Sequence, residues 1–221
     1  MNDIPAPSPV ASSVTQSQTQ NLSDTLLRVA WLSILLGLAI EVILLVITTG
    51  AGKLPGIQSI AADLTQKISW SMIVCVGLAF GKAASKGQSS WMALAGLVSA
   101  PIAFNVARTL HKSISFALKA AEPGTGAAFP FLIVGVKGLE YAALGLLLGW
   151  VGKRANAKVS AYAGVGLLVG IVFGGLIVGL LAPAEFDVIK ALPQLINEVL
   201  FPLGCSLALF AADAIGKRTA S

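Results

Sequence analysis

Six long apolar segments, separated by short polar stretches, dominate the chain. They cover residues 25–49, 66–81, 90–111, 128–151, 159–182 and 193–215. Most approach the roughly 20 residues that an α-helix needs to cross about 30 Å of hydrocarbon. Polar residues gather between the segments rather than along one helix face, unlike the pattern of a large soluble core. The pattern predicts an all-α polytopic membrane protein with six transmembrane helices, and 66–81 is the weakest of the six.

The composition supports a membrane protein. Hydrophobic residues make up 56% of the 221 residues and charged residues 11%, whereas a soluble domain carries about 25% charged residues. The net charge of +5 is divided among short loops, without the basic stripe and interleaved aromatic residues of a nucleic-acid-binding surface. We therefore expect the lipid bilayer as the main partner and no nucleic acid.

The two ends of the chain differ from its middle. Residues 1–23 are rich in Pro, Ser, Gln and Thr, and such a segment buries too little apolar surface to offset the entropy of ordering. We expect a disordered N-terminal tail at 1–23, a six-helix domain at 24–216 and a short C-terminal tail at 217–221. Three polar stretches next to the apolar segments are predicted to be short amphipathic helices on the membrane surface: 54–65, 112–121 and 185–192.

Basic residues concentrate in two short connections and just after the last apolar segment, on the side of the membrane that both termini share. They are Lys82, Lys86, Lys153, Arg154, Lys158, Lys217 and Arg218. By the positive-inside rule, this distribution predicts that the N and C termini are both cytoplasmic. The expected location is the cell inner membrane, crossed in multiple passes.

A Gly-Lys pair recurs at 81–82, 152–153 and 216–217, each time near the end of an apolar segment. Glycine in the left-handed conformation ends many helices, and a lysine suits the helix C-terminus. The recurrence favours two interpretations that the sequence leaves open. One is an internal triplication that produced three helical hairpins, and the other is a common way of ending membrane helices.

Glycines four residues apart mark two of the segments as packing surfaces. Small residues at this spacing let another helix backbone approach closely. The partner helix belongs either to this chain, to a second copy or to another membrane subunit. The glycines are Gly145 and Gly149 in the fourth segment, and Gly166, Gly170, Gly174, Gly175 and Gly179 in the fifth.

Ionisable residues inside the apolar segments are the main functional signal. Such residues are costly in lipid and normally face protein or water. Six of them fall in the half of the bilayer away from the termini: Glu41, Arg108, His111, Lys137, Glu140 and Glu198. They predict a polar pocket, open to the outside, that takes a small solute or an ion.

Two groups of these residues have alternative explanations. Lys137 and Glu140, at i and i+3, share a helix face and can pair, so they form either a structural ion pair or the lining of a cavity. Arg108, His111 and Lys112 form one cationic face, which either extends to the lipid headgroups or attracts an anion.

The sequence contains no signature of catalysis. Cys75 and Cys205 lie in apolar segments without CxxC spacing or a nearby histidine, so we expect free thiols and no metal site. No Walker loop, HExxH or GxSxG motif occurs, so an enzyme is not favoured and no cofactor is expected. We hypothesise a small transporter or channel-like subunit; the alternative is a non-catalytic structural or assembly subunit of a larger membrane complex.

Overall fold

The structure, a computed structural model, describes residues 9–52, 54–84, 88–120, 130–154, 158–181 and 188–219. Within these ranges every regular element is an α-helix, and each helix contains a stretch long and apolar enough to cross a membrane. This confirms the prediction of an all-α, multi-pass membrane protein. The helices are α1 (Pro9–Gly50), α2 (Ile57–Ala84), α3 (Ser89–Ala117), α4 (Pro130–Gly152), α5 (Val159–Leu181) and α6 (Val188–Thr219).

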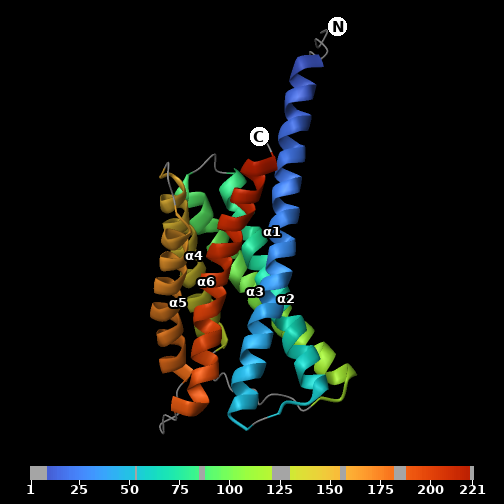
Figure 1. The fold of residues 1–221 in the computed structure, drawn as a ribbon, viewed down its shortest axis with the longest axis vertical. Coiled ribbons are helices and arrows are strands. Elements are labelled where there is room, and N and C mark those ends of the chain that lie inside the picture. Colours follow the sequence, from blue (N-terminus) through green and yellow to red (C-terminus); the bar gives the residue numbers. More distant parts are fainter. Residues whose placement is uncertain are drawn as a thin grey trace.

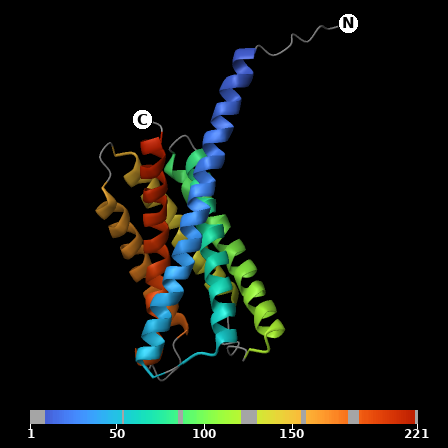
Figure 2. The ribbon, with the colours of Figure 1, turned by 45° about the vertical axis from the view of Figure 1, so that its right-hand side comes forward.

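The helices form a ring in chain order. Each helix packs against the next one, and α6 packs against α1 to close the ring. α1 begins and α6 ends at the same end of the bundle, which we call the terminal end (Figure 1). At the opposite end, the loop end, α2 and α3 diverge from α6 in both views (Figures 1 and 2). Because α2 packs on α3 as extensively as α3 packs on α4, the three hairpins do not form separate packing units.

Large apolar side chains cover the outside of the bundle. Examples from five helices are Leu35, Met72, Ile102, Leu146 and Ile171, all exposed. A soluble protein of this size does not expose so much contiguous apolar surface, whereas lipid tails solvate it. The outer surface therefore agrees with the helix lengths in assigning the bundle to a bilayer.

Two predicted surface helices are instead the ends of longer helices. Residues 57–65 belong to α2 and residues 112–117 belong to α3, so the prediction of separate amphipathic helices there is wrong. Neither stretch contains a proline or glycine that would break the helix, and an unbroken helix keeps its backbone hydrogen bonds inside the membrane. Of the third stretch, 188–192 lies in α6 and the remainder lies outside the described residues.

The chain ends also differ from expectation. α1 begins at Pro9 and extends past the other helices (Figures 1 and 2), so residues 9–23 are helical rather than disordered. The segment has no proline after the first helical position and no glycine, and extending an existing helix gains one hydrogen bond for each residue fixed. α6 likewise continues to Thr219. Residues 1–8 and 220–221 lie outside the described part of the chain.

The Gly-Lys pairs do not share one structural role. α4 ends at Gly152, but Gly81 and Gly216 lie inside α2 and α6, so the helix-ending prediction is wrong at these two sites. Gly81 instead permits close packing of α2 on α3, because a Cβ there would lie 2.5 Å from the Cβ of Ala95. Among the residues that the structure describes, the glycine with a left-handed backbone conformation is Gly52, at φ 75°.

The glycines of α4 lie directly against α3. A Cβ at Gly149 would lie 2.7 Å from the Cα of Ser89, and a Cβ at Gly145 would overlap the carbonyl oxygen of Met92. On the facing helix, a Cβ at Gly96 would overlap the carbonyl oxygen of Tyr141. Small residues on both helices therefore set this crossing, and the partner of the α4 glycines lies in the same chain.

The glycines of α5 divide between two faces. One face packs on α6 and contains Gly166, Gly170 and Gly174; a Cβ at Gly170 would lie 2.8 Å from the Cα of Val199. Nothing lies within 4 Å of a Cβ built at Gly175 or Gly179, so the prediction that these two pack against another helix does not hold within the described chain. Spacing alone did not show which glycines face α6.

The Gly170→Leu variant is expected to lose stability, because the new side chain would meet α6 backbone atoms that cannot move aside. Overpacking of this kind costs about 1–3 kcal/mol or more. Gly175→Leu is the matched control, since it adds the same side chain to the same helix on the open face. Thermal denaturation in detergent should show a lower Tm for Gly170→Leu only, and equal Tm values for the two variants would contradict the assigned packing.

The two cysteines form a disulfide, so the expectation of free thiols is wrong. Cys75 of α2 and Cys205 of α6 are joined with a Cα–Cα distance of 5.6 Å, which lies in the usual range for disulfides. Both side chains are fully buried. Their spacing in the sequence gives no sign of the pairing, because it depends on α2 and α6 meeting across the ring.

Candidate functional site

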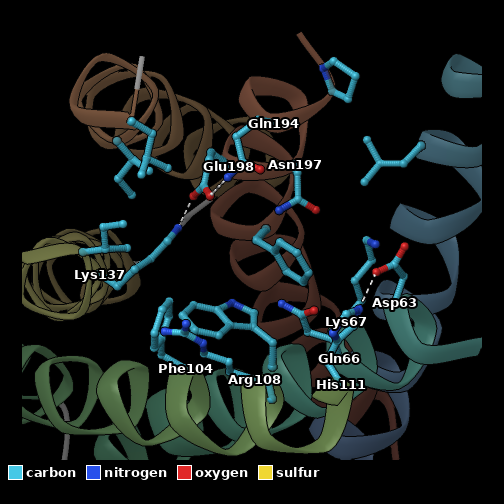
Figure 3. Close-up of a pocket in the computed structure, with 18 of the residues that line it drawn as sticks. Asp63, Gln66, Lys67, Phe104, Arg108, His111, Lys137, Gln194, Asn197 and Glu198 are labelled. Atoms are coloured by element: carbon cyan, nitrogen blue, oxygen red, sulfur yellow. Dashed lines mark hydrogen bonds and ion pairs between the residues drawn. The ribbon is translucent and has the colours of Figure 1, made fainter. Parts of the chain in front are cut away.

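A cavity of about 520 Å³ opens inside the ring, in the half of the bundle nearest the loop end. All six helices contribute to its wall, starting with Leu44 of α1. Figure 3 shows Lys137 and Glu198 on one side, Lys67, Asp63 and His111 on the other, and Phe104 and Arg108 along α3. The polar lining residues are Asp63, Gln66, Lys67, Arg108, His111, Lys112, Ser115, Lys137, Gln194, Asn197 and Glu198.

Helical periodicity places these residues on inward faces. On α2, the lining residues 63, 66, 67 and 70 fall at i, i+3, i+4 and i+7, and on α6 residues 194, 197, 198 and 201 repeat the same pattern. Side chains at this spacing lie on one face of a helix. The polar stripes of α2, α3 and α6 therefore face one another across the cavity instead of facing lipid.

The cavity is bounded on the terminal side by contacts between α2 and α6. Trp70 and Phe201 are lining residues, and the next turn of each helix toward the terminal end contains the disulfide Cys75–Cys205. Further along, Lys82 of α2 forms an ion pair with Asp213 of α6. The cavity therefore lies toward the loop end, and the described contacts between α2 and α6 bound it toward the terminal end.

A buried ionic cluster lies in the wall of the cavity. The Nζ of Lys137 donates a hydrogen bond to Oε2 of Glu140 at 2.8 Å, and it also donates to Oε2 of Glu198 across the gap between α4 and α6. Gln194 Nε2 donates to the other Glu198 oxygen at 2.7 Å. Relative exposures are 6% for Lys137, 0% for Glu140 and 4% for Glu198. One ammonium therefore serves two carboxylates.

Aromatic rings surround the ammonium of this cluster. Lys137 Nζ lies 5.5 Å from the ring centroid of Trp70 and 5.9 Å from that of Tyr141, within the range of cation–π attraction. Trp70 Nε1 donates to the Tyr141 hydroxyl at 3.3 Å, and Phe104 and Phe201 meet the Trp70 ring edge to face. The rings fix the position of Lys137 and limit the water that reaches it.

Two further ionic contacts lie across the cavity from the cluster. Lys67 Nζ of α2 lies 2.5 Å from Oε2 of Glu41 on α1. His111 Nε2 of α3 lies 3.0 Å from Oδ1 of Asp63 on α2. Each contact joins neighbouring helices of the ring, so these pairs also hold α2 to α1 and α3 to α2 in the half of the bundle where α2 and α3 diverge from α6.

Arg108 and Lys112 contribute positive charge to the cavity wall. Both line the cavity, and neither forms an ion pair with a carboxylate of the described residues. They lie one helical turn apart on α3, with His111 between them in the sequence. The α3 wall is therefore the cationic side of the cavity.

The structure brings the six sequence-predicted pocket residues to this one region. Four of them line the cavity, and Glu41 and Glu140 instead bind the lining residues Lys67 and Lys137. Sequence reasoning missed a further set of polar lining residues: Asp63, Gln66, Lys67, Gln194 and Asn197. The i, i+3, i+4 spacing of polar residues in α2 and α6 is the signal that would have found them.

Among the side chains that the structure describes, no group of three His, Cys, Asp or Glu residues is placed to hold a metal ion. Comparisons with protein families, with curated proteins and with solved structures found no match for the chain. The fold and the site together define a multi-pass membrane protein with a polar, ion-paired cavity between its helices.

Proposed function

We propose that the protein is a small transporter or channel-like membrane protein whose cavity admits an ion or a small charged solute. The observation that supports this most strongly is that all six helices contribute to one cavity that contains a buried ionic cluster. Ionisable groups at membrane depth are costly, and those that persist commonly mark solute or ion pathways. Apolar residues of similar volume would serve helix packing equally well.

The proposed orientation places the termini in the cytoplasm and the cavity mouth outside the inner membrane. Lys82 near the end of α2 and Lys153, Arg154 and Lys158 between α4 and α5 lie at the terminal end. Basic residues in short connections are retained on the cytoplasmic side. The loop end, and with it the cavity, would then take its solute from the exterior.

Osmotic re-swelling of proteoliposomes tests this function across several classes of solute at once. Vesicles are shrunk in sodium chloride, choline chloride, sodium lactate or glycine, and re-swelling is followed by light scattering. We expect at least one solute to enter faster than into protein-free vesicles. Asn197→Trp, which fills the cavity, should abolish the difference, whereas the lipid-facing control Leu176→Trp should retain it. Rates equal to those of protein-free vesicles for every solute would contradict the proposal.

One observation favours the alternative role as an assembly subunit. Gly175 and Gly179 lie four residues apart on the outer face of α5, with open space beside both, and such a pair suits close approach of a helix from another chain. In this case the protein would co-purify with other membrane subunits or as an oligomer. Gly175→Leu would then release the partner while leaving the Tm of the isolated chain unchanged.

A further inference from the structure

The cluster of Lys137, Glu140 and Glu198 has an imbalance of charge. With all three groups ionised, two carboxylates surround one ammonium, and one negative charge is left in excess. Lys137 and Glu140 belong to the membrane-spanning part of α4 and Glu198 to that of α6, and an uncompensated charge is strongly disfavoured at such a position. The cluster therefore requires one more positive charge to be neutral.

The described neighbours of the cluster do not supply this charge. Gln194, which binds Glu198, is neutral, and the nearby Trp70 and Tyr141 bind each other. The lining residues of α5, Ile177 and Leu181, are apolar.

The other charged groups that face the cavity come from α2 and α3. Lys67 is paired with Glu41 of α1, and His111 is hydrogen-bonded to Asp63. Arg108 and Lys112 form no ion pair with either carboxylate of the cluster. Within the described residues, no second cation therefore contacts the cluster, and a positive charge in direct contact with it would have to come from the cavity.

The two carboxylates differ in their access to the cavity. Glu198 lines it, and its partner Gln194 is exposed. Glu140 lies outside the lining and is fully buried, and its Oε1 has no hydrogen-bond partner among the described atoms. A hard metal ion needs several oxygen ligands at once, whereas a proton needs one oxygen. The geometry therefore suits a proton that enters at Glu198.

We propose that the cluster binds one exchangeable proton, which Glu198 takes from water in the cavity. The proton neutralises the cluster whichever of the two carboxylates then holds it. This inference deepens the proposed function, because it assigns a proton-binding group to the cavity that the solute enters. The Lys137 ammonium remains charged throughout and holds the second carboxylate.

Infrared difference spectroscopy between alkaline and acidic buffer tests the proposal directly. We expect the carboxyl C=O band of a protonated, buried glutamic acid to rise on acidification, and to shift when the protein contains 13C-labelled glutamate. The isotope shift separates this band from any contribution of Asp63. Absence of a glutamic acid band in the labelled wild-type protein would overturn the proposal. This measurement does not depend on any amino-acid substitution.

Three variants locate the proton. Glu198→Gln and Glu140→Gln each leave one carboxylate for one ammonium, so both should lose the band. Glu41→Gln is the matched control, because Glu41 is also buried but is paired one to one with Lys67, and it should retain the band. Retention of the band in both cluster variants, or its loss in Glu41→Gln alone, would place the proton elsewhere and overturn the assignment.

The result separates this inference from the proposed function. The spectra are recorded without a solute and without flux, so solute entry with no glutamic acid band would contradict the proton site alone. A glutamic acid band with no entry of any solute would contradict the transport role alone. Sodium and choline are compared at constant pH. If sodium removes the band and choline does not, an alkali cation competes with the proton for the cluster. That result would overturn the proposal.

Discussion

The Lys137→Met variant is expected to lose about 3–5 kcal/mol of stability, the usual cost of removing one partner from a buried ionic contact. The substitution leaves Glu140 and Glu198, at 0% and 4% exposure, without their shared cation. Thermal denaturation in detergent, or unfolding in increasing SDS, measures the loss. A variant as stable as the parent would show that the two carboxylates do not depend on Lys137.

Glu140→Gln should have a smaller effect. From sequence alone, Glu140 is the natural partner of Lys137, and its removal would leave the lysine unpaired. In the structure Lys137 keeps Glu198, so the loss should be that of one hydrogen bond to a charged group, about 1.5–3 kcal/mol at most. A larger loss of stability in Lys137→Met than in Glu140→Gln therefore distinguishes a three-residue cluster from a simple pair.

A triple variant separates stability from function. Lys137→Met, Glu140→Leu and Glu198→Gln together replace the cluster by uncharged side chains of similar size. Buried ionic groups are often replaceable in this way at little cost, so most of the stability lost in Lys137→Met should return. The swelling response and the glutamic acid band should both be absent in the triple variant. A triple variant that is both stable and active would reduce the cluster to a structural role.

The lengths of the apolar segments are enough to predict the membrane fold, but they do not predict where each helix begins and ends. In α2, Asp63, Gln66 and Lys67 lie around residue 66, where the predicted segment began because the polar stretch 54–65 before it was assigned to a separate surface helix. These side chains face a cavity and not lipid, so the helix continues to Ile57. Polar residues occur both where a helix leaves the membrane and on a helix face that lines an internal cavity. The sequence alone does not distinguish these two cases.

The sequence was enough to predict several residues of the site, but not which of them form ion pairs with one another. The depth of Glu41, Lys137 and Glu198 along their segments was enough to place them in one half of the bilayer. Their partners depend on which helices are neighbours in the ring, and the sequence does not contain that order. Lys137 therefore had a visible partner at i+3, whereas Glu198, on a helix far along the chain, was not expected to bind it.

Because both native cysteines are joined in the disulfide, an introduced cysteine can be labelled in the otherwise native chain. The chain contains two cysteines, and both are in the bond, so an introduced cysteine provides the free thiol. Asn197 lines the cavity, Leu176 lies on the outer surface of α5 at 48% exposure, and Lys158 is exposed in the α4–α5 connection at the terminal end. Each is replaced by cysteine in a separate variant.

Labelling of these variants in oriented membranes by a membrane-impermeant maleimide tests most directly whether the cavity is open to water. Because the cavity lies in the half of the bundle nearest the loop end, Asn197→Cys should react from the side opposite to that of Lys158→Cys. Leu176→Cys, surrounded by lipid at similar depth, should not react from either side. Failure of Asn197→Cys to react from either side, while Lys158→Cys reacts normally, would contradict a water-accessible cavity.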